Sequence, residues 1–346
     1  MQGHRWRRDN AYFSSEAFSR SWTPARSVYL RDNYKDALLH AGMNTPIPPT
    51  SINNKGIVTS LDRIIDDFFG LNQINLSYIN GSAYGRLCRE KPELDGSELA
   101  RRLLTGISGN RSALTQAGKP VRGSQMWRFK KNPKLASGNA SLEVRIERAI
   151  ARLMDSDWVN QVPVASGLTA GHEAKRSIDL VHRRSDTEYD FIELKALSPG
   201  KRCGGNQTPL FAAMEILQYG LIFLYCRENQ LVLFPGTADL HPLLRARIIH
   251  LEVLMTPNCY QQQGGIDLSG IAWLNSILLG CLEELNRRTP CLVSFTFAFR
   301  QFPQEFLWTE DDHRALVESE IDGCWPGTLR DKIQRAIAGR EPVGIC

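Results

Sequence analysis

Two apolar segments decide the fold: SIDLV at residues 177–181 and FIELK at residues 191–195, separated by a short polar stretch. Each has the length and composition of a buried strand. Side chains alternate between the faces of a strand, so Glu193 and Lys195 share one face while the residue between them points into the core. Burying Asp179 with them costs several kcal/mol unless the charges are paired or hold a cation. The segments therefore predict a strand pair that carries a polar site.

Helix and strand signals continue on both sides of this pair. The chain is expected to form, in order, a helix over 141–154, strands over 158–164, 177–182 and 189–196, a helix over 208–219 that opens with Thr208-Pro209, and a buried strand over 221–225. Strands over 231–234, 248–255 and 292–299 and helices over 268–286, 311–321 and 326–338 are expected beyond them. Alternating helices and strands predict an α/β protein.

The organisation predicted along the chain has two parts. Residues 1–134 carry few strand signals and form a separate, mainly helical region, with one clear helix from Thr59 or Ser60 to Gly70. Residues 135–346 form the second domain, with a core over 141–226 followed by an extension of strands and helices. The first region could bind a protein partner, a small-molecule signal or the substrate, and its residues favour none of these.

Composition places the chain among ordinary globular proteins. It has 346 residues, 42% of them hydrophobic, and a net charge of +5. The charged start has no apolar run behind it, and the longest apolar run, residues 221–226, is far below the roughly 20 residues that span a bilayer. We therefore expect a cytoplasmic protein without a membrane span. Its eight cysteines are scattered singly, which predicts free thiols and no structural zinc.

The positive charge is concentrated in residues 101–134, a segment without acidic residues in which aromatic side chains alternate with basic ones. This pattern indicates a nucleic-acid contact, although a solvated linker would have a similar composition. A glycine-rich loop at residues 198–207 could clamp a phosphate backbone or serve as a flexible connector. The predicted nucleic-acid-binding residues of the two segments are Arg122, Trp127, Arg128, Lys130, Lys131, Lys201 and Arg202.

The order of elements, with Asp179 on one strand and Glu193-x-Lys195 on the next, resembles the PD-(D/E)XK nuclease superfamily over roughly residues 141–226. That family has an αβββαβ core, the restriction-endonuclease-like fold, with a mixed central sheet flanked by helices. Its members include restriction, recombination and repair nucleases and defence effectors. Ile178 stands where the family's name has a proline, and many members of the family also lack this proline.

The resemblance implies a metal-dependent DNA endonuclease, plausible in restriction or anti-phage defence. Asp179 and Glu193 would hold Mg²⁺ or Mn²⁺, with the backbone carbonyl of Leu194 as a further ligand. Lys195 would orient the metal-activated water and help to deprotonate it for attack on phosphorus. Cutting both strands needs two such sites, so a homodimer is expected.

Two further positions in the resemblance are less sharply defined. Glu143 and Glu147 lie four residues apart on one helix face, so either could be the helix acid that joins the metal. The apolar run after Glu147 favours this residue, while Glu143 could pair with an arginine. Gln218 occupies a position where some members place a glutamine that touches the scissile phosphate or the water, but a hydrogen bond to the helix backbone would explain it equally well.

Other interpretations remain open at this stage. Lys195 could neutralise Asp179 or Glu193 as a cross-strand pair without a metal. The chain could be a catalytically inactive nucleic-acid-binding or assembly protein of the same fold, or a nuclease directed at RNA. His172 and His182 flank the site strands and are expected on the solvated surface. No pattern of a Ser-His-Asp or Cys-His triad is present.

Overall fold

The computed structural model describes residues 57–109, 126–132, 135, 141–164, 176–201, 203–229, 241–262, 265–266, 268–289, 292–322 and 325–343. Contacts group residues 53–346 into one compact unit, and every described element lies within it.

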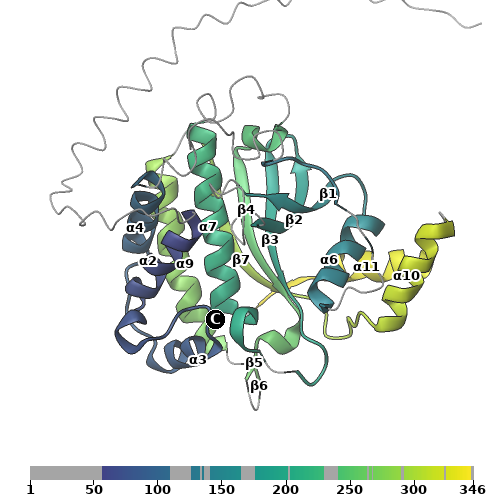
Figure 1. Ribbon diagram of the computed structural model, residues 1–346, viewed down its shortest axis with the longest axis horizontal. Helices are drawn as coiled ribbons and strands as arrows, with labels where there is room; N and C mark the ends of the chain where they lie inside the picture. Colours follow the sequence, from purple (N-terminus) through teal and green to yellow (C-terminus); the bar gives the residue numbers. More distant parts are fainter. Residues whose placement is uncertain are drawn as a thin grey trace, which may run out of the picture. The chain divides into compact units, whose positions relative to one another are not determined.

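A six-stranded mixed sheet forms the centre of this unit, with the strand order β1-β2-β3-β4-β7-β8 (Figure 1). The first three strands are antiparallel neighbours, β4 and β7 run parallel to β3, and β8 returns antiparallel to β7. The predicted α/β class is therefore confirmed. The strands are β1 (Trp158–Pro163), β2 (Ser177–Ser185), β3 (Glu188–Lys195), β4 (Ile248–Met255), β7 (Ser294–Gln301) and β8 (Glu341–Pro342), and a separate small hairpin pairs β5 (Gln261–Gln262) with β6 (Gly265–Ile266).

Helices cover both faces of the sheet (Figure 1). On one face, α7 (Pro209–Glu228) packs on β3 and β4, and α9 (Leu268–Arg288) packs on β7. On the other face, α6 (Leu142–Leu153) contacts the first three strands and is backed by α10 (Glu310–Asp322) and α11 (Gly327–Ala338). Each face has its own cluster of buried apolar side chains, so the sheet separates two cores.

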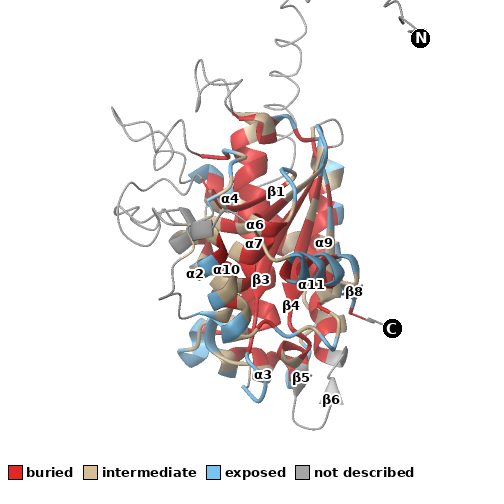
Figure 2. Cartoon of the chain, turned by 90° about the vertical axis from the view of Figure 1, so that its right-hand side faces the viewer, coloured by how far each residue is buried: buried red, intermediate tan, exposed pale blue. Residues whose placement is uncertain are grey.

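The helix α7 corrects one sequence-based prediction. Its start agrees with the cap-plus-proline pattern, because the Thr208 hydroxyl accepts a hydrogen bond from the Phe211 N–H at 3.1 Å. The helix then continues to Glu228, so the strand predicted over 221–225 is wrong. Figure 2 shows α7 buried along most of its length. A helix surrounded by protein needs no polar face, and its apolar run then resembles a buried strand.

The same helix meets the length and composition criteria for a membrane span. Among the described residues it is the one helix to do so, and 94% of its most apolar stretch is buried inside the protein. The strand of the central sheet that follows α7 is β4, after residues that include the strand predicted over 231–234. That strand lies outside the described residues.

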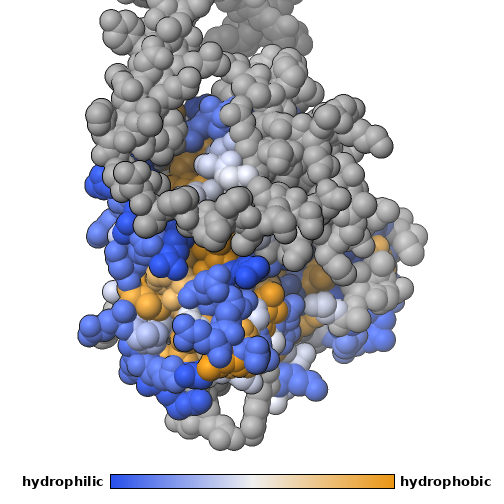
Figure 3. Space-filling view, turned by 60° about the vertical axis from the view of Figure 1, so that its left-hand side comes forward, coloured by the Kyte–Doolittle hydropathy of each residue, from blue (hydrophilic) through white to orange (hydrophobic). Residues whose placement is uncertain are grey.

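Among the described residues, three α-helices precede α6: α2 (Ile57–Phe68), α3 (Gly81–Glu90) and α4 (Gly96–Gly109). They pack on α7 and α9, and Figure 3 shows hydrophobic side chains among hydrophilic ones on this side of the molecule. The contact between α4 and α9 is close, because a Cβ on Gly96 would lie 2.0 Å from the Ile277 carbonyl oxygen. Within the described residues, the boundary predicted near residue 134 therefore does not divide two separate bodies.

The segment 101–134 also differs from its prediction. Its first nine residues belong to α4, where Arg101 and Arg102 both pair with Glu98 at 2.8 Å. The predicted elements α2, α6, β1, β2, β3, β4, α9, β7, α10 and α11 are all present, with ends that differ by a few residues. The five cysteines within the described residues are free thiols, as expected.

Candidate active site

The predicted strand pair is present, and its polar residues meet between α6 and α7. Glu193 and Lys195 lie at the carboxyl end of β3 and share the face that α7 covers. Asp179 comes from the start of β2, and one of its carboxylate oxygens accepts a hydrogen bond from the Leu194 N–H at 3.0 Å. Glu193 and Lys195 are almost fully buried, whereas Asp179 is half-buried. Within the strand pair, Asp179 is therefore more open to solvent than Glu193 and Lys195.

The Lys195 ammonium lies among three carboxylates. Its Nζ atom is 2.5 Å from Glu193 Oε1, 3.6 Å from Glu215 Oε2 and 3.8 Å from Glu143 Oε1. It also lies over the ring of Phe211, 5.4 Å from the ring centroid. One cation thus connects β3 with α6 and α7.

Glu215 is a member of this group that the sequence analysis did not select. It lies on α7, where its Oε1 accepts hydrogen bonds from Arg176 at 3.0 Å and from the Tyr219 hydroxyl at 2.8 Å. A signal was available: Glu215 is the one charged residue between Pro209 and Cys226 in an otherwise apolar helix. A lone acid in a buried helix requires a partner.

Glu143 and Glu147, the two candidates for the helix acid, both reach the site, so the structure does not exclude either of them. Glu143 approaches Lys195, while the Glu147 carboxylate accepts hydrogen bonds from the side-chain amides of Asn160 and Gln161, both at 2.6 Å. Gln161 adopts a left-handed backbone conformation, with a φ angle of 51°. Strained residues of this kind concentrate at functional sites. Together these residues define the acid cluster: Glu143, Glu147, Asp179, Glu193 and Glu215, with Lys195 at its centre.

Burial and mutual repulsion shift the protonation of the acid cluster. Burial raises the pKa of Glu143 to about 7 and that of Glu147 to about 8, and the nearby Asp179 charge adds to both shifts. Burial also raises the pKa of Asp179, and it raises that of Glu193 well above its usual value. Perturbed carboxyl groups gathered in this way are typical of functional sites.

The pKa values of Lys195 and Glu215 shift in the direction that favours their charged forms, because the contacts of these two side chains outweigh the effect of burial. Burial alone would lower the pKa of Lys195, but the carboxylates of Glu193 and Glu215 raise it well above its usual value. Burial alone would raise the pKa of Glu215, but the Lys195 ammonium lowers it. The lysine is therefore held as a cation, with Glu215 as a charged partner.

Gln218 lies on α7 but makes its contacts outside the acid cluster. Its amide nitrogen donates to the Tyr78 hydroxyl at 2.9 Å and to Asp62 at 3.2 Å, and the Tyr78 hydroxyl donates to Asp62 at 2.5 Å. A hydrogen bond from Gln218 to the helix backbone is the alternative that the sequence left open. The contacts of its amide nitrogen are instead with Tyr78 and Asp62. Its predicted catalytic role remains a prediction.

The predicted nucleic-acid residues fall into different environments. Trp127 is fully buried, with its ring 5.3 Å from that of Phe223, so the prediction that it contacts nucleic acid is wrong. Lys131 is half-buried and donates to the Met154 carbonyl at 2.9 Å. Arg128, Lys130 and Lys201 are exposed. Arg122 and Arg202 lie outside the described residues.

The end of the basic segment is nevertheless connected to the acid cluster. The Asn160 side chain accepts from the Asn132 N–H at 2.8 Å and donates to the Asn132 carbonyl at 2.9 Å. The same amide nitrogen donates to Glu147. Residues 126–132 are therefore held beside Glu147 on α6, although Trp127, the one aromatic residue among the predicted nucleic-acid-binding residues, is in the core.

The flanking histidines do not join the acid cluster. His182 contacts the buried Asp190 at 2.9 Å and stacks on Trp158 with ring centroids 4.3 Å apart, so its predicted solvated position is only partly correct. His172 lies outside the described residues. The predicted metal role of the Leu194 carbonyl also remains a prediction, since the contact observed for Leu194 is its N–H.

Comparison with known proteins returns no match. No protein-family model matches the chain, no curated protein matches it, and no solved structure matches it. The function is therefore argued from the geometry of the acid cluster.

Proposed function

We propose that the protein is a metal-dependent phosphodiesterase that cuts DNA, with the acid cluster as its active site. The observation that carries this proposal is the meeting of Asp179, Glu193 and Lys195 with acids from both flanking helices. The order α6-β1-β2-β3-α7-β4 supports it, since this is the αβββαβ order of the PD-(D/E)XK core.

The acid cluster has the chemistry to accept a divalent cation. Five carboxyl groups face two basic side chains, Lys195 and Arg176, so the fully ionised cluster would carry excess negative charge. Glu193 Oε2 is buried and has no hydrogen-bond donor among the described residues. Carboxylate oxygens are the ligands that Mg²⁺ and Mn²⁺ prefer. A bound cation would occupy the place of the protons that the raised pKa values retain.

Asp179 and Glu193 are the proposed ligands, with Glu147 or Glu143 as the third acid. Among the described residues, no three such side chains are already grouped to hold an ion. The Lys195 ammonium is paired with Glu193 instead, and Glu215 lies within 3.6 Å as an alternative partner. Ion binding would therefore transfer Lys195 from Glu193 towards Glu215.

The cation, when bound, would polarise the phosphate and activate water. Lys195 keeps its proton in the arrangement described, so its direct role would be to place positive charge beside the phosphate oxygens. Its predicted role as proton acceptor has no support from this protonation state. Asn160 and Gln161 would fix the orientation of Glu147, and Arg176 with Tyr219 would fix that of Glu215.

Two alternatives from the sequence remain as competing interpretations. The Lys195–Glu193 contact by itself, between two residues of β3, would suit a structural ion pair without a metal. Four further carboxyl groups around that pair favour the active-site interpretation, because a structural pair has no need of them and they add repulsion. A protein of this fold that binds nucleic acid without cutting it, or that cuts RNA, would preserve the same fold, so the substrate must be tested directly.

The test is cleavage of supercoiled plasmid, single-stranded DNA and RNA by the purified protein with Mg²⁺, Mn²⁺ or EDTA. Asp179→Asn and Glu193→Gln are expected to lower the rate at least 100-fold, about 3 kcal/mol of transition-state free energy. Glu318→Gln, which changes an exposed acid on α10, serves as the matched control. No metal-dependent cleavage of any of the three substrates, or cleavage that survives in both variants, would refute the proposed active site.

The assembly expected for cutting both strands is tested separately. Sedimentation with a DNA duplex present should give a species of two chains if two active sites act together. A monomer that still linearises plasmid would contradict the dimer while leaving the proposed active site intact.

A further inference from the structure

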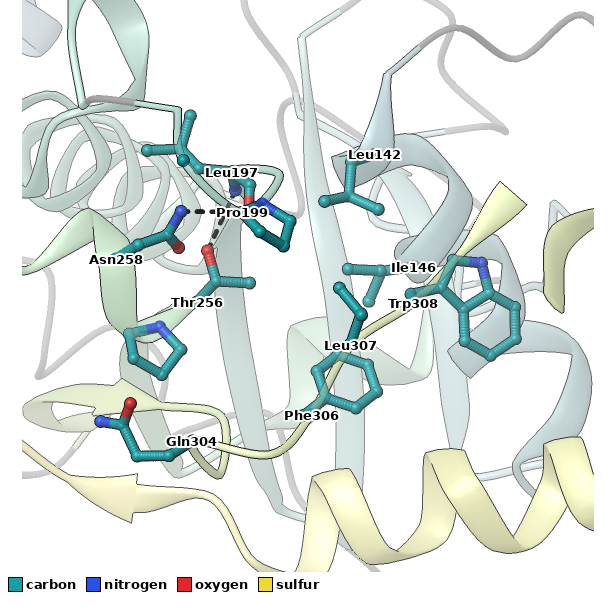
Figure 4. A pocket seen from close by; sticks show the side chains of 12 residues that line it. Leu142, Ile146, Leu197, Pro199, Thr256, Asn258, Gln304, Phe306, Leu307 and Trp308 are labelled. Atoms are coloured by element: carbon teal, nitrogen blue, oxygen red, sulfur yellow. Dashed lines mark hydrogen bonds between the residues drawn. The ribbon is translucent and has the colours of Figure 1, made fainter. Parts of the chain in front are cut away.

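A cavity of about 270 Å³ lies beside the acid cluster, at the edge of the sheet where β3 and β4 end (Figure 4). Leu142 on its wall is the neighbour of Glu143, and Leu197 comes two residues after Lys195. Thr256, also in the wall, donates its backbone N–H to the Lys195 carbonyl at 3.2 Å. The cavity is therefore built from the chain segments that position the acid cluster.

Four segments of the chain form its walls, as Figure 4 shows, and one of them is the stretch of Leu197, Pro199 and Gly200 that follows β3. Leu142 and Ile146 come from α6, and residues 256–258 follow β4. The fourth wall is the connection between β7 and α10, which contributes Phe306, Leu307 and Trp308. Leu307 is 43% exposed, an unusual position for a large apolar side chain in this protein. The cavity thus presents aromatic and aliphatic surface to whatever enters it.

The polar groups of the cavity are neutral. Its lining includes the amides of Asn258 and Gln304 and the hydroxyl of Thr256, and none of its lining residues carries a charge. Asn258 donates to the carbonyls of Leu197 and Ser198 at 3.2 and 3.1 Å, which fixes the loop after the lysine. A site without charge is unsuited to a phosphate group or a metal ion.

We infer that this cavity binds one unstacked nucleobase of the substrate strand, next to the phosphate that the acid cluster would cleave. This inference depends on the proposed function. A base has a flat apolar surface for the Phe306 and Leu307 side chains and a polar edge for the neutral amides of Asn258 and Gln304. A volume of about 270 Å³ lies below the roughly 300–1,000 Å³ of pockets for drug-sized ligands, which suits a single ring system.

Three variants separate a ligand role from a structural one. Phe306→Ala and Leu307→Ala remove apolar wall, and Trp308→Phe reduces the aromatic wall while keeping one ring. Leu279→Ala is the matched control for Leu307→Ala, because Leu279 is 44% exposed on α9 and lies outside the cavity. Thermal unfolding of each variant shows whether it is still folded.

The experiment measures binding of single-stranded DNA oligonucleotides in EDTA, in which each nucleotide in turn is replaced by an abasic site. For the wild-type protein, one abasic position is expected to weaken binding about tenfold. In Phe306→Ala, Leu307→Ala and Trp308→Phe the intact strand should bind more weakly and the abasic effect should shrink, while Leu279→Ala should match the wild type. A 2-aminopurine at the same position should change its fluorescence on binding.

The outcomes distinguish this inference from the proposed function. Metal-dependent cleavage without any position-specific abasic effect would overturn the base-binding cavity and leave the nuclease in place. An abasic effect that persists unchanged in all three cavity variants would also overturn it. A protein that neither binds nor cuts DNA or RNA would refute both.

Discussion

The acid cluster predicts that the metal-free protein loses stability as the pH rises. Glu147 is 1% exposed, and burial raises its pKa from 4.5 to about 8. Between these two values the folded protein holds a proton that the unfolded chain has released. Stability from this proton is complete below pH 4.5 and is lost progressively as the pH approaches 8.

The size of the effect follows from the pKa shift. Each pKa unit corresponds to about 1.4 kcal/mol, so Glu147 alone should lower the free energy of unfolding by about 3.5 kcal/mol between pH 5 and pH 8. Glu147→Gln removes this proton equilibrium. Its amide can lose one of the hydrogen bonds from Asn160 or Gln161, at a cost of about 1 kcal/mol. The variant should therefore be about 2 kcal/mol more stable than the wild type at pH 8, and at pH 5 no more stable than it.

Urea unfolding in EDTA at half-unit steps from pH 5 to pH 8 measures this directly. The fluorescence of the buried Trp127 and Trp158 reports unfolding, and Glu318→Gln controls for the change of an exposed acid. The slope of the unfolding free energy against pH counts the protons released on unfolding. In Glu147→Gln this number should be smaller by about one, and in the control it should stay unchanged. An unaltered slope in Glu147→Gln would show that the burial of this carboxyl group is not what couples stability to pH.

Three further changes test other parts of the structure. Lys195→Met should cost about 3–5 kcal/mol of unfolding free energy because it leaves buried carboxylates unpaired, and less at pH 5 than at pH 8, as urea titrations at the two pH values would show. Gly96→Ala should lower stability by about 1–3 kcal/mol, since its Cβ would meet the Ile277 carbonyl at 2.0 Å, whereas Gly109→Ala, with open space around it, should change stability by less than about 0.5 kcal/mol; equal melting temperatures would contradict the close packing of α4 on α9. Trp127→Ala should cost about 3–5 kcal/mol as a core truncation, and a folded variant with normal stability and weaker DNA binding would restore the surface role rejected above.

Local sequence patterns were sufficient to predict most of the helices and strands of the sheet domain. The alternation around Asp179 and Glu193 identified two adjacent strands, and apolar spacing with a serine start identified α6. Both depend on short-range geometry, namely the period of a strand and the period of a helix. The same rules selected Lys195 and four of the five acids that the structure brings together, namely Glu143, Glu147, Asp179 and Glu193.

The rest depended on packing that no local pattern contains. The run over 221–225 looked like a strand because α7 is apolar on all sides. Glu215 was overlooked because its partners, Lys195 and Arg176, are distant in sequence and meet it only in the folded protein. Trp127 was assigned to the surface from its basic neighbours, although its own side chain packs against Phe223.

The central claim is that the acid cluster holds a divalent cation, and calorimetric titration of the metal-free protein with Mn²⁺ tests it most directly. The account predicts binding to the wild type and to Glu318→Gln, with at least tenfold weaker binding to Asp179→Asn and Glu193→Gln. Mn²⁺ binding that is the same in all four proteins, or absent from a folded wild type, would contradict it.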